Sequence, residues 1–171
     1  KADAGYQAIL RIHREQYHTR RAIEGELAWI AALKQAEAVV TPDSYIGKNG
    51  EVIQKGRIEG LKNPRYMVLF EFIEGAHPDE QGDLAGGFEE LGEIAARTHA
   101  HAKTWQRPAH FERLTWNVET VFGAEAKWGD WRDAPHVTPE VAKVLERVEA
   151  RICARLSAFG MGRDRYGLIH A

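Results

Sequence analysis

The sequence predicts an α+β fold in which a β-rich half, residues 1–75, precedes a helical half, residues 76–171. Up to Gly75 the apolar residues occur in short runs, which are typical of strands. After Gly75 they recur at intervals of three and four residues, which are typical of amphipathic helices. Gly75 and Pro78 interrupt both patterns, so the boundary between the halves is expected there.

Composition bounds the class of protein. A chain of 171 residues forms one domain or two small lobes. Its net charge of −2 provides no general attraction to nucleic acid or to an anionic membrane, and no apolar run approaches the roughly 20 residues that span a bilayer. The lone Cys153 cannot form an intramolecular disulfide, which fits a reducing compartment. We therefore expect a cytoplasmic protein without nucleic-acid or membrane partners.

The first elements are expected to be a strand and a helix. Residues 6–13, YQAILRIH, have the pattern of a strand. Residues 19–35 have one apolar helical face, with Thr19 as a plausible N-cap. Gly25 lies inside this helix, where it costs roughly 1 kcal/mol relative to alanine. The face consists of Ile23, Leu27, Ile30 and Ala31.

Two further segments of the first half are expected to join the strand in a small sheet. Residues 44–55 place Asn49-Gly50 between short apolar runs, which predicts a tight hairpin. Residues 65–75, RYMVLFEFIEG, are apolar nearly throughout, which predicts an interior strand. The expected result is a small sheet with one helix against it.

The second half is expected to be mostly helical. Asp83 is a candidate cap for a helix that reaches about Trp105. Residues 106–137 are irregular and rich in aromatic side chains. Thr138 and Pro139 then form a strong helix start, and Gly160 is the expected stop.

The last residues, RYGLIHA, predict a short buried strand that ends at His170. A domain seldom finishes on an apolar strand, because chain ends are usually exposed. Lys1 is not an initiator methionine, so we expect the chain to be the interior of a longer protein.

Five short stretches, in this order, resemble the aminoglycoside phosphotransferase and choline kinase-like family, a branch of the protein kinase-like fold. They are AILRIHR, EGELAWIAAL, YMVLFEFIEG, FEELGEIAARTHAH and YGLIHA. They resemble, in turn, the third small-lobe strand, its pairing helix, the strand that leads to the hinge, the large-lobe helix and the entry to the catalytic loop. The Trp-rich stretch TWNVETVFGAEAKWGDW suggests the homoserine kinase-like or stress-response kinase-like branch.

The resemblance implies a two-lobed kinase-like fold that is incomplete at both ends. Residues 1–75 would be the small nucleotide-binding lobe with the hinge at its end, and residues 76–171 the truncated helical lobe. The implied activity is transfer of the γ-phosphoryl group of ATP to a hydroxyl of a small molecule, or in some branches of a protein Ser or Thr. His170 would begin His-x-Asp, with a structural role. The aspartate and the Mg²⁺ ligands would then lie beyond Ala171, and the chain alone is expected to be inactive.

The resemblance also assigns cofactor-binding roles to individual residues. Arg11 would contact the phosphates of ATP, since a guanidinium offers two parallel hydrogen bonds and a permanent charge. Glu26 would pair with Arg11, with Glu24 as its rival. The Glu71 carbonyl and the Ile73 amide would bind adenine.

Each of these assignments has an alternative. Arg11 is a surface arginine in the simplest interpretation, although strand alternation puts it on one face with Ile9 and His13. Most helix glutamates are solvated, and a strand that leads to a turn needs no ligand. The competing alternative for the whole chain is a noncatalytic nucleotide-binding or interaction module.

No metal site is expected elsewhere. His99 and His101 lie about 200° apart on a helix, so they cannot share one ion. Trp116, Trp128 and Trp131 are expected to anchor the irregular segment, rather than to form an acceptor pocket that binds an ammonium group.

Overall fold

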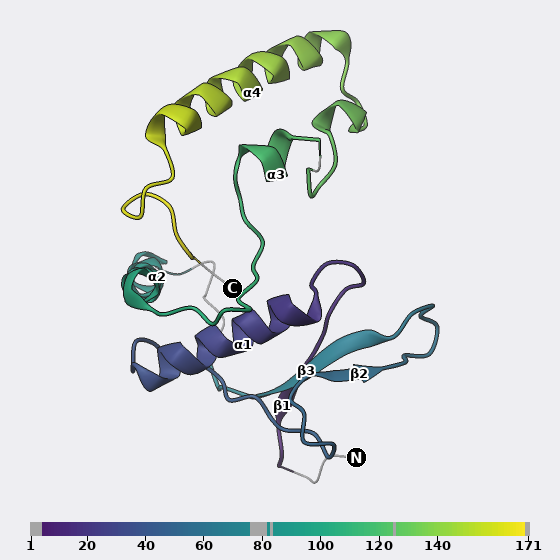
Figure 1. Ribbon diagram of the computed structural model, residues 1–171, viewed down its shortest axis with the longest axis vertical. Helices are drawn as coiled ribbons and strands as arrows, with labels where there is room; N and C mark the ends of the chain where they lie inside the picture. The colour runs from purple at the N-terminus through teal and green to yellow at the C-terminus, as the bar shows by residue number, and fades with distance from the viewer. Residues whose placement is uncertain (1–4, 76–81, 83, 125, 170–171) are drawn as a thin grey trace. The chain divides into compact units, whose positions relative to one another are not determined.

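A computed structural model of the protein describes residues 5–75, 82, 84–124 and 126–169 (Figure 1). It is a mixed α+β structure with one small antiparallel sheet. The chain forms two compact units, Lys1–Arg113 with Leu168–Ala171 and Leu114–Gly167, and each is described here by itself. The lobe boundary expected after residue 75 stays a prediction. No helix among the described residues is long and apolar enough to cross a membrane.

The first unit contains a three-stranded sheet in the order β1-β3-β2. The strands are β1 (Ala8–Ile12), β2 (Gln54–Gly56) and β3 (Arg65–Glu71). Both neighbours pair with β3 antiparallel. The nearly continuous apolar run therefore forms the central strand, as predicted.

Helix α1 (Arg20–Gln35) covers one face of this sheet (Figure 1). Thr19 caps it, because its hydroxyl accepts a hydrogen bond from the Ala22 N–H at 3.0 Å. The predicted strand, helix and cap are confirmed. Between sheet and helix lies a buried cluster of Ile23, Ile53, Val68 and Phe70.

The hairpin predicted over residues 44–55 does not form as expected. Ser44 bridges to Phe70 at one end of β3, and β2 pairs with the other end, so the two arms pair with β3 rather than with each other. The physical reason is that the free edge of a central strand offers more backbone partners than a short isolated hairpin does.

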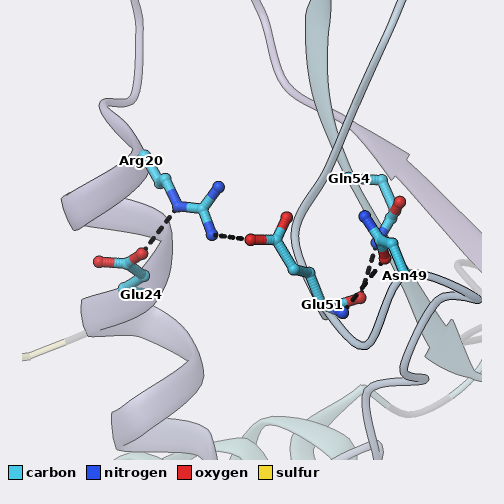
Figure 2. A network of polar contacts seen from close by, with 5 residues as sticks. All are labelled: Arg20, Glu24, Asn49, Glu51 and Gln54. Atoms are coloured by element: carbon cyan, nitrogen blue, oxygen red, sulfur yellow. Dashed lines mark hydrogen bonds and ion pairs between the residues drawn. The ribbon is translucent and has the colours of Figure 1, made fainter.

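The turn inside this segment uses Asn49 through its side chain. Of the Asn49-Gly50 pair only Gly50 has a positive φ, 79°. The Asn49 Oδ1 accepts hydrogen bonds from the Glu51 N–H at 3.1 Å and from Gln54 Nε2 at 2.8 Å. Arg20 of α1 joins this network through Glu51 at 3.3 Å and also pairs with Glu24 (Figure 2).

Helix α2 (Ala85–Thr104) is the second long helix of this unit. Its Ala102 packs with Trp29 and Leu33 of α1 in a second buried cluster, which Trp105 and Leu168 border. The helix is confirmed close to its predicted bounds. Asp83, the expected cap, lies outside the described residues.

The strand predicted at the end of the chain does not form among the described residues up to Ile169. Leu168 packs on the second cluster, whereas Ile169 is 57% exposed. A strand needs a neighbouring strand to pair with, and no described segment pairs here. His170 lies outside the described residues.

The second unit, residues 114–167, contains α3 (Val118–Phe122), the 3₁₀ turn η1 (Trp131–Asp133) and α4 (Pro139–Phe159). Thr138 caps α4, Pro139 opens it, and Gly160 ends it with a φ of 77°. All three were predicted. The segment expected to be irregular thus contains two short helical turns.

Candidate nucleotide-binding site

Arg11 lies on β1 opposite Val68 of β3. Its guanidinium stands over the Phe70 ring, 5.0 Å from the centroid. The neighbours Leu10 and Ile12 are 54% and 46% exposed, and alternation puts them on the other face. Arg11 therefore lies on the face that α1 covers, and its side chain is still 46% exposed.

Glu26 projects from α1 toward Arg11 and forms an ion pair with it. The carboxylate is buried, with 5% of its side chain exposed. Glu24, the rival for this partner, instead pairs with Arg20 at 2.9 Å on the surface (Figure 2). The expected proximity of Arg11 and Glu26 is confirmed, and their role toward a nucleotide stays a prediction.

Arg113 is a second cation on the same carboxylate, and sequence reasoning missed it. Its Nη1 lies 3.6 Å from Glu26 Oε2 and donates a hydrogen bond to the Ala22 carbonyl at 3.2 Å. Only 14% of its side chain is exposed. No spacing rule points to a residue in an irregular segment. The one available signal is general: a buried carboxylate requires compensating charge.

Two histidines lie close to these charges. His13 is 5% exposed, and its Nδ1 lies 3.4 Å from Nδ1 of His18. Its Nε2 has no hydrogen-bond partner among the described residues. Burial lowers the pKa of His13, and so do His18, Arg11 and Arg113, against the opposing pull of Glu26. Burial also lowers the pKa of His18, with Arg113 as the next cause.

The expected hinge lies at the end of β3. The Glu71 N–H donates to the Asp43 carbonyl at 2.8 Å, which fixes the end of the strand. Glu71 and Ile73 line an open pocket of about 620 Å³ together with residues of the α1 C-terminus and Arg97. Neither Arg11 nor Glu26 lines this pocket, so the hinge residues and the ion pair do not share it.

A family model described as the phosphotransferase enzyme family matches residues 1–171. The chain belongs to this family. It is also similar to a solved structure, "Structure of the microcompartment-associated aminopropanol kinase", with a TM-score of 0.85 and 38% sequence identity. That match covers 98% of this chain and 51% of the other, so the chain spans about half the length of that solved protein. A comparison with curated proteins found no match.

Family membership confirms the resemblance derived from the sequence. Kinases of this family use ATP and Mg²⁺. A half-exposed guanidinium, held by a buried carboxylate, fits a phosphate group. Among the described residues no three His, Cys, Asp or Glu side chains come together as a metal site. That the Mg²⁺ ligands lie beyond Ala171 stays a prediction of the resemblance.

The remaining side chains considered from sequence have structural contacts. His101 Nδ1 accepts a hydrogen bond from the Trp29 indole at 3.4 Å, and His99 Nε2 lies 3.1 Å from the Ile169 carbonyl. Trp131 is anchored to α4, because its indole donates to Glu149 at 2.7 Å. Trp116 and Trp128 pack against each other at 4.5 Å, and each is 54% exposed.

Proposed function

We propose that this chain is the nucleotide-binding part of an ATP-dependent phosphotransferase that transfers the γ-phosphoryl group to a hydroxyl of a small molecule. The observation that carries the proposal is the Arg11–Glu26 ion pair, which joins β1 to α1 on the covered face of the sheet. Phosphotransferases of the kinase type require such a pair to be in place before they act.

Arg11 would bind phosphate oxygens through the N–H groups that Glu26 leaves free. A guanidinium has five donors, and one carboxylate oxygen does not satisfy them all. Glu26 fixes the position of the side chain from one side, and the Phe70 ring supports it by cation–π attraction. Arg11 would thus supply a prepositioned charge where the transferred group becomes more negative.

Adenine would be held by the Glu71 carbonyl and the Ile73 amide at the end of β3. The bond from the Glu71 N–H to Asp43 supports this assignment, because it fixes the strand immediately before the two backbone groups. The two-lobed arrangement, with a small lobe over residues 1–75, belongs to the same proposal. So does the cytoplasmic location expected from the composition.

The acceptor we propose is a small amino alcohol. The support is the 38% identity to a protein described as an aminopropanol kinase. Two other outcomes remain for the test: a kinase of protein Ser or Thr, and a noncatalytic nucleotide-binding module.

The test is ATP turnover by the full-length protein with aminopropanol, other amino alcohols and a protein substrate. We expect ADP formation that depends on an amino alcohol, and its loss in Arg11→Met. Arg14→Met is the matched control, because Arg14 lies in the same basic segment, is exposed and stacks on Tyr17. ATP binding without turnover on any acceptor would favour the noncatalytic module, and equal loss in both variants would contradict the role of Arg11.

A further inference from the structure

A short strap, residues 111–113, lies against the N-terminal half of α1. The Thr19 hydroxyl donates to Glu112 Oε1 at 2.6 Å, and Arg113 donates to the Ala22 carbonyl at 3.2 Å. A Cβ at Gly25 would lie 3.0 Å from the Glu112 carbonyl oxygen and 3.3 Å from the Phe111 ring. Close approach of this strap therefore explains a glycine in the middle of a helix.

The strap is held from its other side as well. The Phe111 ring packs edge-on against Trp105, with centroids 5.3 Å apart, and Trp105 stacks on Trp29 of α1 at 6.5 Å. Trp29 is 3% exposed and belongs to the second buried cluster. The backbone that carries Arg113 is thus fixed to the same helix that carries Glu26.

The two arginines on Glu26 differ in their surroundings. Arg11 faces Oε1 and is 46% exposed, whereas Arg113 faces Oε2 and is 14% exposed. Arg113 is the more enclosed cation and also binds a helix carbonyl, so its place is fixed by two contacts. Arg11 is the more accessible cation, because nearly half of its side chain is exposed.

We propose that Arg113 is a positioning residue for phosphate binding, an inference that rests on the function proposed above. It holds one oxygen of Glu26, which fixes the direction of the other oxygen toward Arg11. It also offsets part of the negative charge of Glu26, so that Arg11 does not have to compensate this carboxylate by itself. Arg11 then keeps donors for a phosphate while it remains oriented by its partner.

This role predicts a selective effect on nucleotides. Adenosine lacks phosphates and would not contact Arg11. Loss of Arg113 should weaken binding of ATP about tenfold, which corresponds to about 1.4 kcal/mol, and leave adenosine within about twofold. A residue with a purely structural role would weaken both ligands alike.

The experiment measures the dissociation constants of Mg²⁺-ATP and of adenosine for the full-length protein by calorimetry, in wild type, Arg113→Met and Arg113→Lys. Arg20→Met is the control, because it removes an arginine of α1 that pairs with Glu24 and Glu51 on the surface. We expect the preference for ATP to fall in Arg113→Met, to fall less in Arg113→Lys, and to stay unchanged in the control.

The outcomes separate this inference from the proposed function. A wild-type protein that does not prefer ATP over adenosine contradicts the proposed function itself. A wild-type preference that survives in Arg113→Met overturns the positioning role alone. If Arg113→Met does not fold, Arg113→Lys decides, since lysine keeps the positive charge but replaces the planar guanidinium with a flexible ammonium group. An unchanged preference in that variant overturns the role too.

Discussion

Glu26 and Glu24 lie two positions apart on α1 and have opposite surroundings. Glu26 is buried between two guanidiniums, whereas Glu24 belongs to a surface pair with Arg20. The apolar periodicity of the helix could not tell which of the two carboxylates is buried, because both lie at the edge of the apolar face. Only the position within the family motif favoured Glu26, and the structure confirms that choice of partner.

Glu26→Gln should lower the free energy of unfolding by about 1–3 kcal/mol, because it leaves the enclosed Arg113 without its counter-charge. This loss of stability is expected to be smaller than the loss from breaking a fully buried ion pair, since Arg11 is half-exposed. Glu24→Gln, the matched control, should stay within about 0.5 kcal/mol. Urea unfolding of the three proteins measures this. Equal losses in the two variants would contradict the burial argument.

The histidine pair predicts a loss of stability on mild acidification. The pKa values of His13 and His18 are lowered in the folded protein, so the unfolded chain binds more protons near pH 6.5. Their contribution is fully present above the unfolded pKa of about 6.5 and is lost as pH falls through the lower folded values. The free energy of unfolding should therefore decrease between pH 7.5 and 5.5.

His13→Gln should reduce this pH dependence of the free energy of unfolding, because it removes one of the two histidines whose protonation favours the unfolded chain. His110→Gln is the control, since His110 is exposed. Urea unfolding at several pH values checks both. A wild-type profile that is flat over this range would contradict the linkage, as would an unaltered slope in His13→Gln.

At the scale of elements, local chemistry predicted α1, β3 and α4 well, because each has its own signal. Thr19 and Thr138 accept the expected capping hydrogen bonds, and the apolar run of β3 is central. Two predictions failed for the opposite reason. The pairing of residues 44–55 and the strand near residue 168 depend on partners distant in the sequence, which local pattern does not encode.

Replacing either of two helical glycines by alanine should change the free energy of unfolding, in opposite directions at the two positions. A Cβ at Gly92 of α2 would meet no described atom within 4 Å beyond its chain neighbours and its own helix backbone, whereas one at Gly25 of α1 would meet the strap at 3.0 Å. Gly92→Ala should raise the free energy of unfolding by about 0.5–1 kcal/mol through helix propensity. Gly25→Ala should lower it, because the strap backbone must shift. Thermal unfolding of both variants measures this. Higher stability of Gly25→Ala would contradict the argument, because it would show that the strap can move away at little cost.

At the scale of the whole molecule, the family and its ordered motifs were predictable, and the completed charge cluster was not. Arg11 and Glu26 follow from motif order. Arg113 comes from a segment without periodicity, 91 residues from its backbone partner Ala22. Tertiary folding brings it there, so no local rule finds it.

The polypeptide of residues 1–171 should bind adenosine and ATP with similar, weak affinity. The hinge groups and Arg11 belong to it, while the resemblance places the Mg²⁺ ligands outside it, so added Mg²⁺ should change little. Dissociation constants from high micromolar to millimolar correspond to about −4 to −6 kcal/mol. Calorimetric titration with each ligand, with and without Mg²⁺, measures this. A strong Mg²⁺-dependent preference for ATP would mean that metal ligands lie within these residues.

The strap also has a consequence for biosynthesis. Ala22 emerges from the ribosome 91 residues before Arg113 does. At about 5–20 residues per second, the interval is about 5 to 18 seconds. During that time Glu26 has Arg11 as a partner but lacks Arg113, the more enclosed of its two counter-ions, and a carboxylate is costly to bury with incomplete compensation. Docking of this helix onto the nascent sheet is therefore expected to finish late in translation, when the strap arrives.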